Sequence, residues 1–412
     1  MVRRSVFAVL AVMAVVLGCV VVSTPAGAVV DTAVVVPSPN AGTTEDALSS
    51  VSCVSKSWCV AVGHTSTDTG NVTLVEMWNG TVWLVVPSPS PFLDSTLTSV
   101  ECLSESSCTA VGDSTDTGPR NMLVEAWNGT EWMVVPSPGA GSFRSDVVKS
   151  VSCVSTTSCV AVGQTWTGSA FATLVMVWDG AAWSVVSSPN AGTSDDELNS
   201  VSCVSATECV AVGSADVGLN ASSAYVTLVM VWDGVEWSIV LSPNAGTSDD
   251  TLRSVSCPSV SECVAVGYTY SGSVYETLVM VWDGIDWSIV SSPNAGTSDD
   301  TLNSVSCPSV SECVAVGHTD PSSDSETLVM VWDGIEWSIV SSPNAGTNDT
   351  LMSVSCPSVS ECVAVGRTDT GSGDETLVVS LTGPVPPSTT TTTETPSSTS
   401  VSPDPVAPAF TG

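Results

Sequence analysis

The chain has 412 residues, of which 42 are acidic and 8 are basic, and its formal net charge at pH 7 is −34. A negative charge of this size excludes electrostatic binding to nucleic acids and to anionic membrane surfaces. Only 12% of the residues are charged and 43% are hydrophobic, which indicates a folded rather than a disordered protein.

Residues 1–28 have the features of a secretory signal peptide. Two arginines precede an uncharged apolar run from Val6 to Val22, and the small-residue sequence that ends at Ala28 resembles a cleavage site. An uncleaved anchor is an alternative, because 17 apolar residues come close to the length that spans a bilayer. A second alternative is lipidation of Cys19, because the sequence that ends at this cysteine loosely resembles a lipoprotein processing box. No other stretch could span a membrane, so we expect no integral membrane domain after cleavage.

The middle of the chain, residues 29–383, consists of one unit written seven times. Each unit contains two cysteines with five residues between them, and the first cysteines of successive units are 49 to 54 residues apart. The unit that starts at Leu302 reads LNSVSCPSVSECVAVGHTDPSSDSETLVMVWDGIEWSIVSSPNAG. A period of this length predicts a repeat architecture.

Four strands are predicted in each unit, with the sequences SVSC, CVAVG, TLVMVW and EWSIV. They are rich in β-branched residues and show no helical period, and the first is expected to be only about four residues long. Asn-Gly or Asp-Gly joins the third strand to the fourth, which predicts a tight hairpin with a positive φ at both turn residues. A repeated four-stranded unit is typical of a β-propeller blade.

The two ends of the repeat region indicate how the ring closes. The seventh unit stops at Gly383 with only three strands, whereas the segment from Ala33 to Pro39 (AVVVPSP) matches the fourth strand of the other units. We therefore predict an all-β fold, a seven-bladed β-propeller of four-stranded blades, in which the N-terminal strand completes the last blade.

Residues 384–412 differ in composition from the repeats. Ser, Thr and Pro predominate without apolar periodicity, which predicts a disordered stalk that carries the propeller away from a surface. The final PAFTG resembles a sortase sorting motif, but the leading Leu, the apolar stretch and the basic tail of such a signal are missing. Chance similarity and the start of a wall-anchoring signal are both compatible with this ending.

The motifs S-V-S-C-x5-C-V-A-V-G and W-D-G-x-x-W, with the linker S-P-N-A-G, resemble those of a group of secreted actinobacterial repeat proteins of unknown function. The resemblance covers roughly residues 33–383. It implies a β-propeller fold and secretion, and it brings no catalytic residues. The turn also resembles the Asp box of sialidase-type propellers, and the Trp-Asp pair resembles WD40 repeats, but the accompanying Ser and Gly-His are missing.

The paired cysteines are predicted to form disulfides. One cysteine ends the first strand and its partner opens the second, so the two face each other across an antiparallel pair at the short separation that a disulfide needs. Zinc ligation is the alternative, but zinc sites use closer spacing, and two histidines cannot serve seven sites. The predicted pairs are Cys53–Cys59, Cys102–Cys108, Cys153–Cys159, Cys203–Cys209, Cys257–Cys263, Cys307–Cys313 and Cys356–Cys362.

Paired tryptophans such as Trp282 and Trp287 flank the turn between the third and fourth strands. Cross-strand packing between blades is the favoured interpretation, and a ladder that stacks on sugars is the alternative.

Sequence variation is concentrated in the linkers between units and in the loops from second to third strands, which we expect on one face of the ring. Variable loops on a constant scaffold indicate a recognition surface. The residue after the Gly of the second strand is the predicted ligand-binding position, and the alternative is a loop position that drifts freely. In the seven units this residue is His64, Asp113, Gln164, Ser214, Tyr268, His318 and Arg367.

The linkers also carry carboxylates in every unit. A ring of hard oxygen ligands could bind Ca²⁺, and the alternative is an acidic rim that keeps the protein soluble. The predicted calcium ligands are Asp195, Asp196, Asp249, Asp250, Asp299 and Asp300.

Three functions fit these features. The favoured one is a non-catalytic secreted or cell-surface propeller, expected to be a monomer, that binds an extracellular glycan, protein or cation. A hydrolase of glycosidase or sialidase type is the second, although the mature chain has no cluster of arginines and no G-x-S-x-G motif. The third is a structural spacer in the cell envelope.

Overall fold

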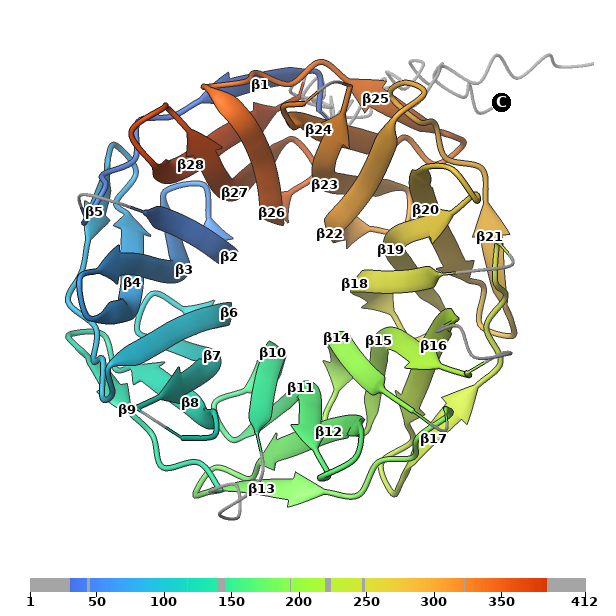
Figure 1. Ribbon diagram of the computed structural model, residues 1–412, viewed down its shortest axis with the longest axis horizontal. Helices are drawn as coiled ribbons and strands as arrows, with labels where there is room; N and C mark the ends of the chain where they lie inside the picture. The colour runs from blue at the N-terminus through green and yellow to red at the C-terminus, as the bar shows by residue number, and fades with distance from the viewer. Residues whose placement is uncertain are drawn as a thin grey trace, which may run out of the picture.

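In the computed structural model of this protein, the described residues are 30–42, 45–116, 118–138, 145–192, 194–218, 224–246, 249–321 and 323–383. They form seven antiparallel sheets of four strands each, arranged as the blades of a β-propeller (Figure 1). The predicted fold is therefore confirmed. The predicted signal peptide, the Cys19 lipidation site and the stalk lie outside the described residues. None of the described segments is an apolar helix of the length that a bilayer requires.

The strands shorten from the axis of the ring to its rim. The innermost strands, with 10 to 12 residues, are β2 (Asp46–Ser55), β6 (Asp94–Ser104), β10 (Asp146–Ser155), β14 (Asp196–Ser205), β18 (Asp250–Ser259), β22 (Asp299–Ser309) and β26 (Thr347–Ser358). The second strands are β3 (Trp58–Thr67), β7 (Ser107–Thr115), β11 (Ser158–Trp166), β15 (Glu208–Asp216), β19 (Glu262–Tyr270), β23 (Glu312–Asp320) and β27 (Glu361–Asp369).

The third strands are β4 (Gly70–Trp78), β8 (Asn121–Trp127), β12 (Phe171–Trp178), β16 (Tyr225–Trp232), β20 (Tyr275–Trp282), β24 (Glu326–Trp332) and β28 (Asp374–Thr382). The outer strands, with three or four residues, are β5 (Trp83–Val85), β9 (Trp132–Val134), β13 (Trp183–Val186), β17 (Trp237–Val240), β21 (Trp287–Val290), β25 (Trp337–Val340) and β1 (Thr32–Val35). Blade 1 consists of β2 to β5, and the blades follow in chain order.

The first and last segments of the described chain close the ring. β1 pairs with β28 in antiparallel register, with Thr32 opposite Thr382 and Val35 opposite Val379, so blade 7 is built from both ends (Figure 1). The N–H of Gly383 donates to the carbonyl of Ser360 in the last cysteine hairpin, at 2.9 Å. The described chain therefore both starts and ends on the side of the ring that carries these hairpins.

Seven hydrophobic clusters, one between each pair of neighbouring blades, make up the core. In β3, Val60 and Val62 pack against blade 2, whereas Cys59 and Ala61 point to the opposite face and pack towards blade 7. Both faces of each sheet are buried, which explains why CVAVG is a continuous apolar run instead of an alternating one.

All seven predicted disulfides are present, each across the first two strands of one blade with Cα atoms 4.0 to 4.1 Å apart. The two tryptophans of each pair pack against each other across the third and fourth strands, as Trp178 and Trp183 do. Their ring centroids lie 5.8 to 5.9 Å apart in all six pairs. In blade 1 the ring of Trp83 is buried between blades, and Trp78 donates from Nε1 to the carbonyl of Lys56 at 3.1 Å.

The hairpin between third and fourth strands differs from the prediction of two positive φ angles. Only its glycine has a positive φ, between 89° and 93° in all six blades that contain it. The preceding residue acts through its side chain instead. In blade 4, Oδ1 of Asp233 accepts the N–H groups of Val235 and Glu236 at 2.8 and 2.9 Å, and these bonds lower the pKa of Asp233. The turn is therefore an Asx-type turn.

A β-bulge interrupts each innermost strand after its repeated Leu or Val. In β2 the register shifts between Leu48 and Ser50, which leaves Ser49 without a partner in the ladder. Opposite the bulge, a Cβ on Gly63 would lie 1.9 Å from the carbonyl oxygen of Ala47, so only glycine fits there. The innermost strand continues beyond the bulge, which is why it is longer than the four residues predicted.

The two serines of the S-V-S-C motif join neighbouring blades. The hydroxyl of Ser200 accepts the N–H of Val255 in the next blade at 3.2 Å, and Ser202 accepts the N–H of Cys257 at 3.1 Å. The first contact occurs at all seven blade junctions. The second occurs at six, and at the remaining junction Glu101 replaces the serine. We call this ring of contacts the serine belt; it satisfies N–H groups of edge strands.

Substitution of Ser200 by Ala is expected to lower the free energy of unfolding by about 1–3 kcal/mol, because the buried N–H of Val255 then lacks an acceptor. Urea denaturation measures the loss. The matched control is Ser261→Ala, since Ser261 is exposed in a cysteine hairpin and should change the midpoint little. Equal midpoints for both variants would contradict a stabilising role for the belt.

Candidate functional site

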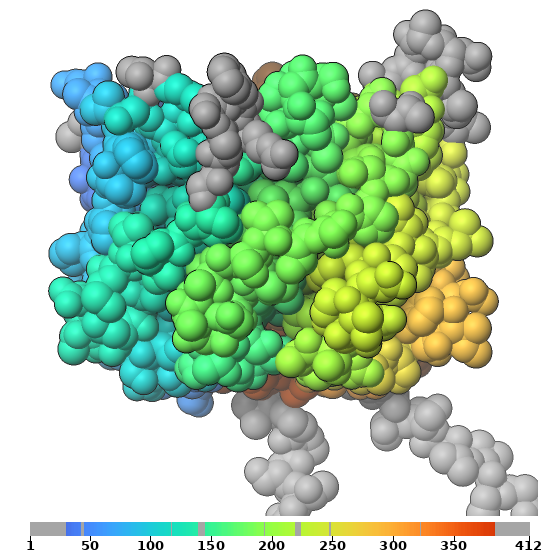
Figure 2. Space-filling view, turned by 90° about the horizontal axis from the view of Figure 1, so that it is seen from below, coloured from blue at the N-terminus to red at the C-terminus, as the bar shows by residue number. Residues whose placement is uncertain are grey.

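The two faces of the ring carry different parts of the repeat. On the linker face, the linkers between blades contact the ends of the second strands, where the loops to the third strands begin. The backbone N–H of Asp216 donates to the backbone carbonyl of Asp195 at 2.8 Å, and that of Tyr270 donates to the carbonyl of Asp249 at 3.0 Å. The opposite turn face carries the cysteine hairpins and the Asp-Gly turns. Figure 2 shows the ring edge-on, with the blades slanting between its faces. The predicted separation of variable and constant loops is therefore correct.

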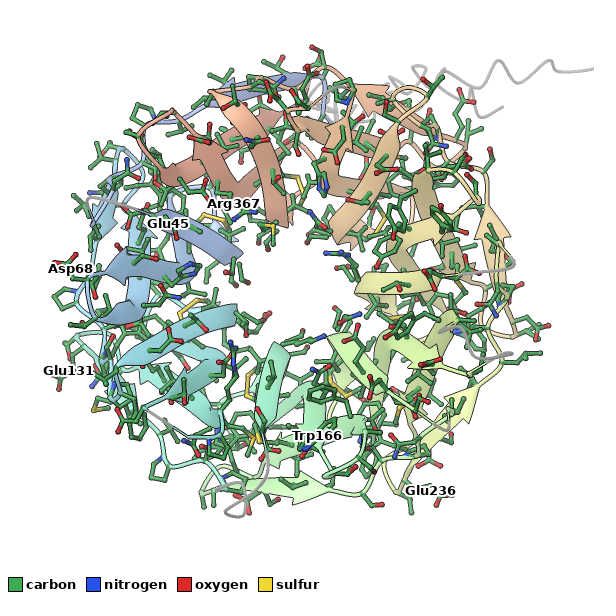
Figure 3. All side chains as sticks on the ribbon, in the orientation of Figure 1. Glu45, Asp68, Glu131, Trp166, Glu236 and Arg367 are labelled. Atoms are coloured by element: carbon green, nitrogen blue, oxygen red, sulfur yellow. A yellow bond between two sulfur atoms is a disulfide. The ribbon has the colours of Figure 1, made fainter. Side chains whose placement is uncertain are left out.

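The seven residues predicted to bind a ligand lie within the second strands near the linker face. Each is paired with the residue before the repeated Leu or Val of the innermost strand, as Tyr268 is with Thr251. Ladder pairing makes them strand positions instead of loop positions, and ligand binding at these residues stays a prediction. Figure 3 places Arg367 towards the axis of the ring, whereas Asp68, Glu131 and Glu236 lie at its rim.

Several of these seven side chains are engaged within their own blade. Arg120 donates to Asp113 at 2.7 Å, and Arg367 donates to Asp374 at 3.0 Å. His318 lies 3.1 Å from the hydroxyl of Thr301. Burial lowers the pKa of His318, as it does for the other histidine of the chain, so both rings are neutral at pH 7. Gln164, Ser214 and Tyr268, in contrast, line pockets.

Two adjoining pockets lie on the linker face. The central pocket, of about 280 Å³, is lined by side chains from the innermost strands of blades 3 to 7, among them Lys149, Asn199, Arg253, Asn303 and Met352. The side pocket, of about 260 Å³, covers blades 3 to 5 and is lined by Gln164, Phe171, Asp195, Ser214 and Tyr225. Glu197, Thr251 and Tyr268 line both, so the two pockets share a wall.

The central pocket is built from the bulge residues. The bulge frees one side chain per blade from the ladder, and this residue is Ser49, Thr98, Lys149, Asn199, Arg253, Asn303 or Met352. Five of these seven residues line the pocket. Sequence reasoning missed them, although a signal exists: this position varies in the sequence L-x-S-V-S-C while its neighbours stay nearly constant.

Hydrogen bonds between blades hold the pocket side chains in place. Nζ of Lys149 lies 2.7 Å from Oε2 of Glu197 and 2.9 Å from Oδ1 of Asn199. The side-chain amide of Asn199 donates to the carbonyl of Leu252 at 2.9 Å, and that of Asn303 donates to the carbonyl of Leu351 at 2.8 Å. The pocket wall is therefore preorganised.

Arg253 has a different environment from the other cations. Its guanidinium lies 5.0 Å from the centre of the Tyr268 ring and donates one hydrogen bond, to Oδ1 of Asn303 at 3.3 Å. Among the described residues it is the one Lys or Arg without a carboxylate within ion-pair distance. The four that have such a carboxylate are Lys56, Arg120, Lys149 and Arg367.

Aromatic side chains gather on the same part of the linker face. All four tyrosines of the chain belong to blades 4 and 5. The ring centroid of Tyr275 lies 5.0 Å from that of Tyr268 and 5.2 Å from that of Tyr270. In blade 3, the rings of Trp166 and Phe171 are in edge contact, with their centroids 5.0 Å apart. The rings around the side pocket are half-buried, which leaves part of each accessible.

The linker carboxylates hold the backbone. The second carboxylate of each pair is buried and accepts a linker N–H at 3.0 to 3.2 Å; these residues are Asp196, Asp250 and Asp300. The first accepts the N–H that opens the neighbouring third strand, at 2.8 to 3.3 Å; these are Asp195, Asp249 and Asp299. In the part of the chain that the structure describes, no three Asp, Glu, His or Cys side chains are grouped to hold a metal ion. Calcium binding stays a prediction.

No family model matches the chain, and no curated protein is significantly similar to it. Several solved structures are similar in fold. A protein of unknown function from Dyadobacter fermentans is 10% identical, with 88% of this chain and 100% of that chain covered and a TM-score of 0.51. YCF48 from Cyanidioschyzon merolae is 11% identical, with 85% and 98% covered and a TM-score of 0.50. A PL25 ulvan lyase bound to a saccharide is 9% identical, with 87% and 95% covered and a TM-score of 0.50. These likenesses show the β-propeller fold alone.

Proposed function

We propose that the protein is a non-catalytic, secreted or cell-surface β-propeller that binds an extracellular ligand in the central and side pockets. The observation that carries this proposal is that three features of a binding site lie together. Variable positions, two adjoining pockets and an aromatic cluster meet on blades 3 to 5 of the linker face. Variable side chains that line pockets on a repeated scaffold are typical of a recognition surface.

The chemistry of the pockets favours binding over catalysis. Lys149 and Glu197 neutralise each other across 2.7 Å, and burial raises the pKa of Tyr225, which keeps its phenol neutral. Amides, hydroxyls and partly exposed aromatic rings make up most of the remaining lining. Such groups orient a ligand by hydrogen bonds and ring contacts.

The proposal includes an extracellular location for the protein. Seven disulfides are typical of proteins that fold in an oxidising compartment. Residues 1–28 as signal peptide and residues 384–412 as stalk would place the ring outside the cell and at a distance from its surface.

The test is binding of the secreted protein to an array of defined oligosaccharides and to extracellular protein extracts. We expect a bound partner whose signal is lost when Phe171 and Tyr225 are both changed to Ala, because these rings line the side pocket. The control is Val235→Ala, since Val235 is 82% exposed on the turn face of the blade that carries Tyr225, and it should leave binding unchanged.

Further measurements on the same protein distinguish the alternative functions. Binding in Ca²⁺ that exceeds binding in Na⁺ at matched ionic strength would support the predicted calcium ligands. Turnover of chromogenic glycosides by the same preparation would contradict the non-catalytic proposal. Binding that survives the double substitution would place the site elsewhere.

A further inference from the structure

The unpaired arginine in the central pocket identifies a chemical class of ligand. We infer that this pocket binds a carboxylate-bearing sugar, a uronic acid residue of an acidic polysaccharide, through the guanidinium of Arg253. This inference rests on the proposed function and adds the ligand class to it.

The guanidinium of Arg253 has hydrogen-bond donors that no protein group uses. Arginine carries five N–H donors in a rigid fork, and Arg253 uses one of them, in a contact of 3.3 Å to Asn303. A carboxylate accepts two parallel N–H bonds from such a fork, which makes the pair both strong and directional. Because the Tyr268 ring and the Asn303 amide already fix the position of the group, a ligand would lose little additional side-chain entropy on binding.

The surrounding charges select the rest of the ligand. Lys149 is neutralised by Glu197, so Arg253 supplies the net positive charge of the central pocket in a chain of net charge −34. Glu197 and Asp195 line the shared wall and the side pocket, where they repel a second anion but accept hydrogen bonds from hydroxyl groups. One carboxylate flanked by several hydroxyls is the pattern of a uronic acid.

Two observations favour a saccharide over an acidic peptide. The side pocket adjoins the central pocket and presents the rings of Phe171, Tyr225 and Tyr268, on which the C–H face of a neighbouring pyranose can pack. A peptide that pairs as an extra strand needs free backbone donors, and the serine belt already satisfies N–H groups along the innermost strands, such as those of Val255 and Cys257.

The test is isothermal titration of the full secreted chain with oligogalacturonate, with the same oligosaccharide after reduction of its carboxyl groups, and with an oligoglutamate peptide. We expect oligogalacturonate to bind, and carboxyl reduction to weaken it at least tenfold. Arg253→Gln should cause a similar loss with an unchanged melting temperature, because the side chain is exposed. Arg253→Lys should recover only part of the affinity, since an ammonium lacks the fork.

The matched control is Arg120→Gln, which removes another linker-face arginine that lies outside both pockets and should leave the affinity unchanged. Equal binding of native and reduced oligosaccharide, insensitive to Arg253→Gln, would overturn the inference and leave the proposed function standing. Binding of oligoglutamate alone, lost in Arg253→Gln, would overturn the choice of a sugar. If no oligosaccharide or protein binds the pockets in either experiment, both proposals fail.

Discussion

A chain that lacks residues 30–39 is expected to melt about 7 °C below the intact protein. Val30 is fully buried, and Ala33 and Val36 pack into the clusters on either side of blade 7. Loss of this burial, at roughly 1.5–3 kcal/mol for a fully buried valine, together with the ladder of β1, amounts to about 5 kcal/mol. The free edge of β28 should also promote aggregation.

The control is removal of residues 384–412, whose composition provides no apolar burial and which should leave the melting temperature unchanged. Differential scanning calorimetry compares the two truncations with the intact chain. Similar melting temperatures for all three would contradict closure of the ring by β1.

A circular permutant distinguishes loss of the closing strand from general damage. The N–H of Asp31 donates to the carbonyl of Thr382 at 3.1 Å, so residues 30–39 can be joined after Gly383 by a short turn. The permutant should recover most of the lost stability, because blade 7 would then be continuous, like the other six. A permutant as unstable as the deletion would show that the strand acts in some other way.

The second large effect concerns two buried carboxyl groups, Glu76 and Glu125. Both side chains are fully buried, and blades 3 to 6 have methionine at the equivalent position, as at Met176. Burial raises the pKa of both groups from 4.5 to about 8. Ser38, beyond β1, donates to Glu76 at 2.8 Å, so one of these carboxyls lies at the closure of the ring.

The raised pKa values fix the direction of the pH dependence. Below pH 4.5 each carboxyl is protonated in both the folded and the unfolded chain, and its contribution to stability is fully present. Between pH 4.5 and about 8 the folded protein keeps a proton that the unfolded chain has lost. The free energy of unfolding therefore falls by about 1.4 kcal/mol per pH unit for each group and levels off above pH 8.

Glu76→Met combined with Glu125→Met should remove this part of the slope and raise the stability at pH 8 by several kcal/mol, on the order of a few pH units at 1.4 kcal/mol each. Urea denaturation at pH 5, 6.5 and 8 measures the difference from the wild type. Glu131 and Glu236 lie at the rim of the ring (Figure 3), so their replacement by Met serves as the matched control. Parallel stability curves for wild type and the buried double variant would show that the carboxyls are hydrated in the folded state.

Most of the fold could be predicted from the repeat itself. The spacing of the cysteines fixed the disulfides, and the match between AVVVPSP and the fourth strands fixed the closure. The length of the innermost strand could not be predicted in this way. In β2, the unpaired residue Ser49 shifts the alternation of inward and outward side chains by one position. In the sequence the ten-residue strand therefore shows a regular pattern over only about four residues.

The candidate site was predicted only in part. The position after the second-strand glycine was found, and three of its seven residues line the pockets. Lys149 and Arg253 were missed because their environment comes from neighbouring blades. Glu197 is 48 residues from Lys149 and Asn303 is 50 from Arg253, and no local pattern signals such contacts. The Asx turn between the third and fourth strands was not predicted, because the side chain of its first residue holds the turn and that residue needs no positive φ.

The described chain enters and leaves the ring on the turn face, at Asp31 and Gly383, while both pockets open on the linker face. A molecule tethered through either terminus would therefore hold its pockets outward from the supporting surface. Neighbouring tethered copies would present these pockets in one common direction. A polymer with repeated recognition units could then engage several copies at once, so that weak single-site contacts would add up to durable adhesion through high effective concentration.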